Sequence, residues 1–442
     1  MQPSARLAAA IELLESIEAA ITSRGMPADH LVSDYFRARR YAGSKDKRAI
    51  SDYVYAVLRS REWLVWGLVQ AGMPLSGRSL LLAHLARQEV ESLELFDAGD
   101  SFAPDALSVA EQEAITALTA LDWCVAPEAI QQNVPAWAAG GLQARFGEEF
   151  SEGAAALLEN APLDVRLNAL RARSSGIKQY LNIEPQDIEK HQYSKSGFRI
   201  KSRINLGAEK AYRDGMIEIQ DEAAQIAAAL VAAKPGHQVI DLCAGGGGKS
   251  LAIVADMENR GQIYAFDISG KRLDDFRSRL KRAGVHNIQV SRIAAEGEGR
   301  ATALKEFDKS ADRVLVDVPC TGSGTWRRSP DQRWRFDEES LADLTALQAS
   351  LLSEGAAMVK PGGRLIYMTC SLLPAENEQI IQEFMAKSHS VWKVCDYKAV
   401  WQEVLESPVP GTLASVPECL QLAPHAHGTD GFFTAIFERV PQ

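Results

Sequence analysis

From Asp221 onward, apolar segments typical of buried strands alternate with segments of helical periodicity. The predicted strands are Gln238–Cys243, Gln262–Asp267, Ile288–Arg292, Arg313–Val318, Arg364–Thr369, Trp392–Asp396 and Phe432–Glu438. The predicted helices between them are Lys249–Asp256, Lys271–Ala283, Glu338–Val359 and Asn377–Met385. Strands that alternate with helices build a parallel sheet covered on both faces, whereas the last two strands have no long crossover between them. The pattern therefore predicts the α/β class, with a doubly wound sheet that ends in an antiparallel pair.

The first half of the chain has a different pattern. Residues 1–130 show helical periodicity without strand-like alternation, and helices are predicted over residues 4–22, 46–70, 78–93 and 110–121. Pro127 and Pro135 then mark a boundary. Beyond it, strand signals are separated by short helices, at residues 163–168, 197–201 and 215–220. We expect three domains: an all-helical domain of residues 1–130, a small α+β module of residues 131–215, and the α/β domain of residues 216–442.

Charge limits the classes of function. The 442 residues carry a net charge of −10, which argues against a surface that binds nucleic acid all over. Two local patches are nevertheless basic, with eight Lys or Arg against two Asp or Glu between Arg37 and Arg61, and eleven against four between Arg166 and Arg213. Each patch is either a solvated face or an RNA-binding surface, and interleaved aromatic residues favour RNA. These aromatic residues are Tyr35, Phe36, Tyr41, Tyr180, Tyr193 and Phe198.

Other features bear on the compartment. No apolar run is long enough to predict a membrane span, and the N-terminal residues resemble neither a signal peptide nor a transit peptide. The six cysteines are widely scattered without a Cys-x-x-Cys pair, so we expect neither a disulfide framework nor a metal site. We expect a cytoplasmic, monomeric protein without membrane attachment.

Two of the cysteines follow predicted strands. Cys320 lies in Asp317-Val-Pro-Cys320-Thr-Gly-Ser-Gly324, and Cys370 lies in Tyr367-Met-Thr-Cys370-Ser371. Open α/β sheets bind their ligands outside the carboxyl ends of the strands. Both thiols and Asp317 are therefore predicted at the ligand-binding edge of the sheet.

A glycine-rich loop joins the first strand of this domain to the next helix, in Val239-Ile-Asp-Leu-Cys243-Ala-Gly-Gly-Gly-Gly-Lys249-Ser250. A P-loop NTPase is one interpretation, because the loop ends in Gly-Lys-Ser, but Cys243 occupies the position of the first glycine of that motif. We favour S-adenosylmethionine, because Asp241 and Asp267 follow two strands and their carboxylates suit a cationic ligand. The predicted cofactor-binding residues are Cys243, Ala244, Gly245, Gly246, Gly247, Gly248, Lys249, Asp267 and Asp317.

Thiols at this edge suit methylation of a pyrimidine carbon. A thiolate that adds to carbon 6 turns carbon 5 into a nucleophile, which can attack a methyl sulfonium. The adduct must then lose the proton on carbon 5 and expel the thiol. Two cysteines, with Asp317 to hydrogen-bond the ring nitrogen N3, provide the groups that this route needs.

These motifs resemble the Sun-type, or Fmu-type, RNA cytosine-5 methyltransferases over roughly residues 135–440. The matching stretches are Asp241–Lys249, Ala265–Asp267, Asp317–Gly324, Arg327–Asp331 with Trp334, Thr369–Ser371 with Glu376 and Asn377, and Asp430–Phe433. The resemblance implies a Rossmann-like seven-stranded methyltransferase sheet, S-adenosylmethionine as cofactor, Cys370 as the nucleophile and Cys320 in product release. It also implies RNA as the substrate, and we expect ribosomal RNA. The helical domain resembles the NusB-like RNA-binding domain of bacterial ribosomal members.

Two positions depart from the family pattern. Gly246 stands where the family has a proline, and Ser291-Arg-Ile-Ala294-Ala295 lacks the aspartate that contacts adenine. The missing aspartate leaves open a second hypothesis, a catalytically weak RNA-binding ribosome assembly factor. A basic and aromatic segment follows the Cys320 loop, and we expect it to contact the RNA backbone and bases. Its residues are Trp326, Arg327, Arg328, Arg333, Trp334 and Arg335.

Overall fold

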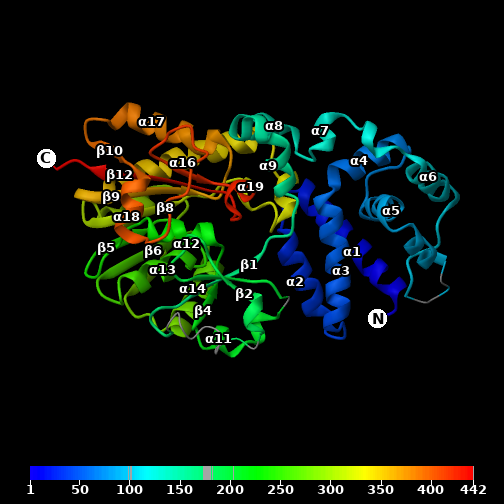
Figure 1. The fold of residues 1–442 in the computed structure, drawn as a ribbon, viewed down its shortest axis with the longest axis horizontal. Helices are drawn as coiled ribbons and strands as arrows, with labels where there is room; N and C mark the ends of the chain where they lie inside the picture. Colours follow the sequence, from blue (N-terminus) through cyan, green and yellow to red (C-terminus); the bar gives the residue numbers. More distant parts are fainter. Residues whose placement is uncertain (98, 100–101, 173–180, 182, 203, 442) are drawn as a thin grey trace. The chain divides into compact units, whose positions relative to one another are not determined.

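The computed structural model describes residues 1–97, 99, 102–172, 181, 183–202 and 204–441 (Figure 1). These residues form two compact units. Unit 1 comprises residues 1–143, 147–160 and 325–338, and unit 2 comprises residues 144–146, 161–324 and 339–442. The predicted boundary at residue 130 lies inside unit 1, and the predicted α+β module is divided near residue 160, so a division into three domains stays a prediction. Tyr180 of the second basic patch lies outside the described residues.

Unit 1 is helical, as expected from the sequence. Its helices are α1 (Pro3–Thr22), α2 (Ala28–Ala38), α3 (Ser44–Arg59), α4 (Arg61–Gln70), α5 (Gly77–Gln88), α6 (Val109–Ala120), α7 (Glu128–Gln131), α8 (Ala136–Phe146, whose last turn belongs to unit 2) and α9 (Phe150–Ala156). Apolar residues three or four positions apart form one face of α1, and Leu7, Leu14 and Ile17 on it are fully buried. They pack in one core with Leu81 of α5.

The helix predicted over residues 46–70 is two helices, α3 and α4, separated by Ser60. Asn133 accounts for the break. Its side-chain oxygen accepts a hydrogen bond from the N–H of Glu62 at 3.1 Å, and its amide donates to the carbonyl of Arg59. These bonds satisfy backbone groups that the end of one helix and the start of the next leave unpaired. The partner lies 71 residues from Glu62, so the local pattern could not predict the break.

Unit 2 contains two sheets, and the smaller has the antiparallel order β2-β3-β1-β4. Its strands are β1 (Leu163–Leu167), β2 (Ile188–Lys190), β3 (Gly197–Ile200) and β4 (Ile217–Ile219). Strands β1, β3 and β4 correspond to the predicted segments. The sequence analysis missed β2 because three residues are too few to show alternation.

The larger sheet has the order β10-β12-β9-β8-β5-β6-β7, with β11 paired to β12. Its strands are β5 (Gln238–Asp241), β6 (Gln262–Asp267), β7 (Ile288–Arg292), β8 (Ala311–Asp317), β9 (Val359–Thr369), β10 (Trp392–Cys395), β11 (Leu420–Leu422) and β12 (Phe432–Arg439). Strands β5 to β9 pair in parallel, whereas β12 runs antiparallel between β9 and β10. The predicted α/β class and Rossmann-like sheet are confirmed.

Helices cover both faces of this sheet. They are α12 (Glu222–Ala229), α13 (Gly248–Asp256), α14 (Gly270–Ala283), α15 (Glu298–Lys305), α16 (Glu338–Met358), α17 (Glu378–Ser388), α18 (Tyr397–Val404) and α19 (Pro424–His427). Helix α11 (Lys210–Arg213) packs instead with the smaller sheet. Because side chains alternate along a strand, Val239 and Ile366 pack against α12, α13 and α18, whereas Ile240 and Tyr367 pack against α16 and α17 (Figure 1). Within the described residues, no helix has the length and apolar character to cross a membrane.

Candidate active site

The two predicted cysteines meet at the carboxyl edge of the large sheet. Strands β8 and β9 are adjacent and parallel, with Asp317 opposite Met368, so the loops that follow them start next to each other. The Sγ atoms of Cys320 and Cys370 lie 3.3 Å apart. The backbone joins the two loops as well, because the N–H of Gly324 donates to the carbonyl of Cys370 at 2.9 Å. The structure thus brings the two thiols into contact, while their separate roles stay predictions.

Two glycines allow this edge to close. The N–H of Gly431, just before β12, donates to the carbonyl of Gly324 at 2.9 Å. A Cβ on Gly324 would lie 2.3 Å from the carbonyl oxygen of Gly431, which is closer than non-bonded atoms approach. A side chain at either position would therefore push β12 away from the cysteine loops.

A buried carboxylate, Glu376, joins the two cysteine loops. It is 0% exposed. Thr321 donates to it through its backbone N–H at 2.9 Å and through its hydroxyl at 2.5 Å. Ser371 donates its hydroxyl to the same carboxylate, and Gln348 of α16 donates its amide at 2.9 Å. Because Thr321 and Ser371 each follow a predicted catalytic cysteine, Glu376 sets the separation of the two thiols.

The motif alone assigns no role to Glu376 or to its neighbour Asn377. In the structure, Asn377 accepts a hydrogen bond from the hydroxyl of Thr369 at 2.6 Å and donates to the carbonyl of Ser371 at 3.0 Å. Both residues are fully buried. One indication was present in the sequence. Both residues are polar and lie between apolar segments, and polar side chains that become buried there must form hydrogen bonds. Only the fold shows which partners these are.

Two groups that border Cys370 have shifted pKa values. The hydrogen bond with Cys370, together with burial, raises the pKa of the Cys320 thiol well above its usual value, so Cys320 keeps its proton at neutral pH. Burial lowers the pKa of Lys249, but the negative charge of Asp317 and its hydrogen bond with Lys249 outweigh burial and raise it overall. Lys249 is therefore a cation. A protonated thiol and a cation therefore border Cys370.

Lys249 and Asp317, both predicted site residues, form an ion pair. Nζ of Lys249 lies 2.6 Å from Oδ2 of Asp317, and the two side chains are 14% and 28% exposed. The ammonium also lies 4.8 Å from the ring centroid of Phe432. The second oxygen of Asp317 has no hydrogen bond to another described residue, so it remains able to accept one from a ligand.

The glycine loop turns from β5 into α13. Gly245 and Gly247 have φ angles of +54° and +76°, a region that favours glycine. A Cβ on Gly247 would lie 2.0 Å from the Phe276 ring, whereas one on Gly245 would meet no atom within 4 Å. The loop is thus packed on one side and open at Gly245. Burial raises the pKa of the Cys243 thiol, which fits the expectation that Cys243 contributes its backbone to the site.

Two carboxylates border this loop. Asp267 accepts hydrogen bonds from the N–H groups of Gly245 at 2.8 Å and Ser269 at 2.7 Å. Asp241 is 1% exposed and accepts one hydrogen bond from Ser250 at 2.6 Å, while its other oxygen has no partner among the described residues. Burial raises the pKa of Asp241 to about 7. An unpartnered buried oxygen beside an open loop fits a ligand with cationic groups, such as S-adenosylmethionine.

Arg279 of α14 also holds the glycine loop, and no motif indicated it. Its guanidinium donates to the carbonyl of Gly246 at 2.6 Å and pairs with Glu218 of β4 at 2.9 Å. Gly246 is the position where the resembling family has a proline. A glycine there leaves the loop more freedom, and the bond from Arg279 restrains it.

The predicted RNA contact by residues 326–335 is wrong for several of them. Trp326 and Arg333 are 0% and 1% exposed within unit 1. Arg333 donates to the carbonyl of Leu157 at 2.5 Å, and its guanidinium lies 5.0 Å from the Trp326 ring centroid. Trp334 donates its indole N–H to a carbonyl of α3 at 3.2 Å. These side chains stabilise unit 1 and are occupied by contacts inside it.

The Arg37–Arg61 patch is only partly available to a partner. Arg39 and Arg61 form ion pairs with carboxylates of α1 at 3.0 and 2.7 Å. Arg40, Lys45 and Arg48 are exposed and have no ion pair with another described residue. The exposed aromatic ring of Tyr41 lies in the same stretch of chain. RNA contact by this patch stays a prediction, and we now expect it only from Arg40, Tyr41, Lys45 and Arg48.

Comparison with known proteins identifies related methyltransferases. Residues 228–438 match the family model of the 16S rRNA methyltransferase RsmB/F. The chain is 33% identical over 307 residues to the probable ribosomal RNA small subunit methyltransferase B of Synechocystis sp.. That match covers 69% of this chain and 66% of the relative, slightly under two thirds of the relative's length.

Solved structures share the fold. The crystal structure of PH0851 has a TM-score of 0.77 at 23% identity and covers 99% of both chains. The methyltransferase homolog protein from Pyrococcus horikoshii has a TM-score of 0.59 at 27% identity, over 70% of this chain and 97% of that chain. The first likeness extends over nearly the whole chain, and the second is to a protein named as a methyltransferase homolog.

Proposed function

Because this chain belongs to the RsmB/F family of S-adenosylmethionine-dependent methyltransferases, we propose that it methylates carbon 5 of a cytosine in small-subunit ribosomal RNA. The observation that carries the proposal is the contact between the two thiols at 3.3 Å, beside the Lys249–Asp317 ion pair. One thiol suffices for attack on carbon 6. A second, kept protonated next to it, suits the release of the product.

In the proposed reaction, the sulfur of Cys370 forms a bond to carbon 6 of the cytosine, and carbon 5 becomes nucleophilic. S-adenosylmethionine, held at the glycine loop, supplies the electrophilic methyl group. The proton that the Cys370 thiol gives up passes to the ring nitrogen N3, and the carboxylate of Asp317 accepts a hydrogen bond from this N3–H and so holds the base, while Lys249 fixes the orientation of that carboxylate. A base, such as a water molecule, then takes the proton from carbon 5, which expels the sulfur of Cys370, and the protonated thiol of Cys320 lies 3.3 Å from that sulfur, where it can donate a hydrogen bond to it as it leaves.

The two other functions are less well supported. In a P-loop NTPase the loop lysine binds phosphate, but here Lys249 is paired with Asp317, and the carboxylates of Asp241 and Asp267 would repel a triphosphate. A catalytically weak assembly factor would not need two thiols in contact. Unmeasurable affinity for S-adenosylmethionine would nevertheless favour it.

The test replaces each thiol separately. Cys370→Ala is expected to lower methyl transfer by roughly 10⁴-fold or more, the scale on which an enzyme loses activity without its nucleophile. Cys320→Ala is expected to accumulate a covalent protein–RNA adduct, because attack remains possible while release is slowed. Transfer of labelled methyl groups to small-subunit ribosomal RNA, and gel separation under denaturing conditions, measure the two outcomes.

Cys124→Ala is the matched control, since Cys124 is an exposed cysteine of unit 1. It should keep full activity and form no stable adduct. Full turnover by Cys370→Ala would refute the proposed role of this thiol. If an adduct accumulates in Cys370→Ala and none forms in Cys320→Ala, Cys320 is the nucleophile and Cys370 assists release.

A further inference from the structure

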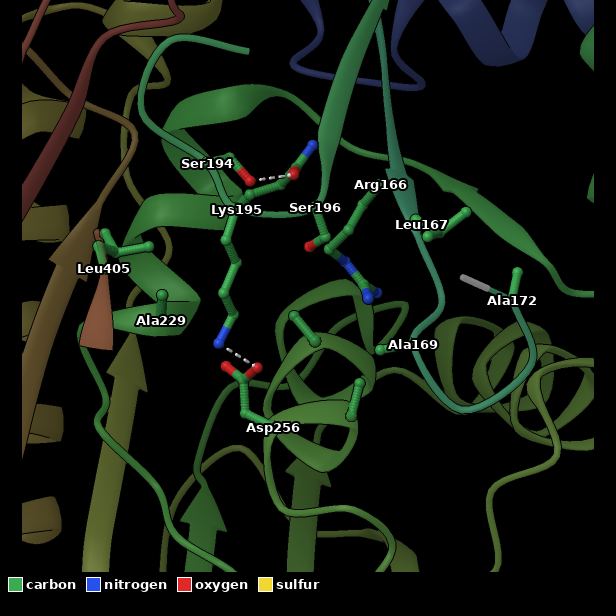
Figure 2. Close-up of a pocket in the computed structure, with 13 residues that line it drawn as sticks. Arg166, Leu167, Ala169, Ala172, Ser194, Lys195, Ser196, Ala229, Asp256 and Leu405 are labelled. Carbon is green, nitrogen blue, oxygen red and sulfur yellow. Dashed lines mark hydrogen bonds and ion pairs between the residues drawn. The ribbon is translucent and has the colours of Figure 1, made fainter. Parts of the chain in front are cut away.

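A cavity of about 540 Å³ lies in unit 2, and none of its lining residues belongs to the cysteine loops or the glycine loop. Strand β1 and residues 194–196 line part of it, and α12 and α13 line another part (Figure 2). Seven of its thirteen lining residues are apolar, and five of these are alanines of α12, α13 and the segment after β1. The volume is in the range of sites that hold small ligands.

A buried cation points into this cavity. Arg166 of β1 is 4% exposed, and Figure 2 shows its side chain extending into the space. Its only hydrogen bond to another described residue runs from Nε to the side-chain oxygen of Gln220, at 2.7 Å. Both terminal nitrogens are therefore left to the cavity. Burial lowers the pKa of Arg166 to about 10, which still leaves it charged at neutral pH.

The nearby carboxylates of the described residues are already paired. Glu218, the cross-strand neighbour of Arg166 on β4, pairs with Arg279 and Arg282 of α14 at 2.9 and 2.7 Å. Asp256 pairs with Lys195 at 2.7 Å (Figure 2). Arg166 itself therefore forms no ion pair with a described residue. Burying a cation without a partner is unfavourable, so this arrangement favours a bound anion.

The donors at the cavity are held in place by a polar network. The backbone carbonyl of Gln220 accepts from the amide of Gln225 at 2.8 Å, and Gln225 accepts from the hydroxyl of Ser194 at 2.7 Å. This network fixes Gln220, which in turn orients the guanidinium. Ser196 also lines the cavity, and its hydroxyl has no hydrogen bond to another described residue. The hydroxyl is thus free to donate to a ligand.

We propose that this cavity binds a phosphate group. A guanidinium presents parallel N–H donors that match two phosphate oxygens, and Arg166 is pre-oriented for this contact by Gln220. Ser196 adds a hydroxyl donor. The alanine walls leave room for the molecule that carries the phosphate. That molecule is either an RNA strand or a small phosphorylated compound, and both offer the same chemistry to Arg166.

The first arm of the test measures RNA binding by the full-length protein. Arg166→Gln is compared with wild type for binding of a small-subunit ribosomal RNA fragment over a series of salt concentrations. If the phosphate belongs to RNA, affinity falls about tenfold, as expected for one lost charge-assisted hydrogen bond, and the salt slope falls by about one. Lys305→Gln, which removes an exposed charge on α15, is the control and should change neither value.

The second arm uses inorganic phosphate as the probe. Thermal unfolding of wild type is measured in phosphate and in chloride at equal ionic strength. If the site takes a small phosphorylated compound, phosphate raises the melting temperature of wild type, because it binds only the folded state. The increase is absent in Arg166→Gln, and RNA affinity is unchanged.

A second variant, which keeps the charge of Arg166, tests the proposal even if Arg166→Gln fails to fold. Ala169→Leu adds bulk at an exposed position of the cavity rim, so it should fold and still weaken binding in whichever arm responds. The proposal is overturned if wild type shows no stabilisation by phosphate and if neither Arg166→Gln nor Ala169→Leu changes RNA affinity or its salt slope. Binding of S-adenosylmethionine plays no part in either arm, so failure of the methyltransferase proposal would not affect the result.

Discussion

At the scale of single residues, one buried carboxylate holds the loops that carry both predicted catalytic thiols. Glu376 accepts hydrogen bonds from both cysteine loops and from α16. A glutamine there would keep the shape but replace one acceptor oxygen by an N–H₂ group that faces donors. A donor that meets donors leaves buried polar groups unsatisfied.

Glu376→Gln is therefore expected to lower the free energy of unfolding by about 2–3 kcal/mol and to slow adduct formation by Cys370. Urea denaturation measures the first effect, and trapping of the protein–RNA adduct in a Cys320→Ala background measures the second. Glu383→Gln, on the exposed surface of α17, should change neither. Unchanged adduct formation in Glu376→Gln would show that the thiols do not need this carboxylate.

A second residue-scale prediction concerns pH. Burial raises the pKa of Asp241 to about 7, so this carboxyl is protonated at pH 6 and ionised at pH 8. A cationic ligand prefers the ionised form, and affinity for S-adenosylmethionine should therefore rise with pH, by about tenfold between pH 6 and pH 8. Titration calorimetry across this range measures the affinity. Asp241→Asn should bind more weakly and show no such rise, whereas a flat profile in wild type would contradict the prediction.

At the scale of elements, helix α14 restrains the cofactor loop. Arg279→Gln removes the bond to the carbonyl of Gly246 while leaving α14 intact. A loop with several glycines then gains freedom that binding must remove, so KM for S-adenosylmethionine should rise about tenfold with little change in kcat. Steady-state kinetics with saturating RNA separate the two constants.

Arg277→Gln is the matched control for this prediction. Arg277 lies on the same helix, is exposed, and pairs with Asp274 of α14. It should leave KM for S-adenosylmethionine unchanged. A fall in kcat with unchanged KM in Arg279→Gln would mean that this side chain acts on the chemical step and not on the loop.

At the scale of the whole molecule, a segment between β8 and α16 belongs to the helical unit. Residues 325–338 cluster with unit 1 although both flanking elements lie in unit 2. Trp326→Ala is expected to lower the free energy of unfolding by about 3–5 kcal/mol, the usual cost of removing a large buried aromatic side chain. Scanning calorimetry measures the loss.

The contrasting variant is Tyr41→Ala, because Tyr41 is 74% exposed in the first basic patch. It should leave stability unchanged and weaken RNA binding. Had the sequence-based expectation for Trp326 been correct, Trp326→Ala would weaken RNA binding at unchanged stability. The two variants together therefore distinguish a packing residue from a stacking residue.

The parts predicted correctly are those with a local cause. Strands such as β6 and β7 carry their apolar pattern within five or six residues, and the α/β order follows from alternation along the chain. The edge of the sheet that holds Cys320 and Cys370 could also be predicted, because parallel strands carry their ligands at the carboxyl end. The predictions that were wrong depend on residues far away in the sequence. Asn133 breaks the helix predicted over residues 46–70, and no pattern within that helix records it.

By itself, the sequence determined the α/β class and predicted which groups react, because strand periodicity and thiol chemistry are properties of short stretches. Only the tertiary structure decided how these groups are held. The 3.3 Å contact of the two thiols, the bonds to Glu376 and the burial of Trp326 and Arg333 all join residues far apart in the chain. Burial removes part of a basic, aromatic segment from the surface, and it leaves the terminal nitrogens of Arg166 without a hydrogen-bond partner among the described residues. Neither outcome can be predicted from the amino-acid composition.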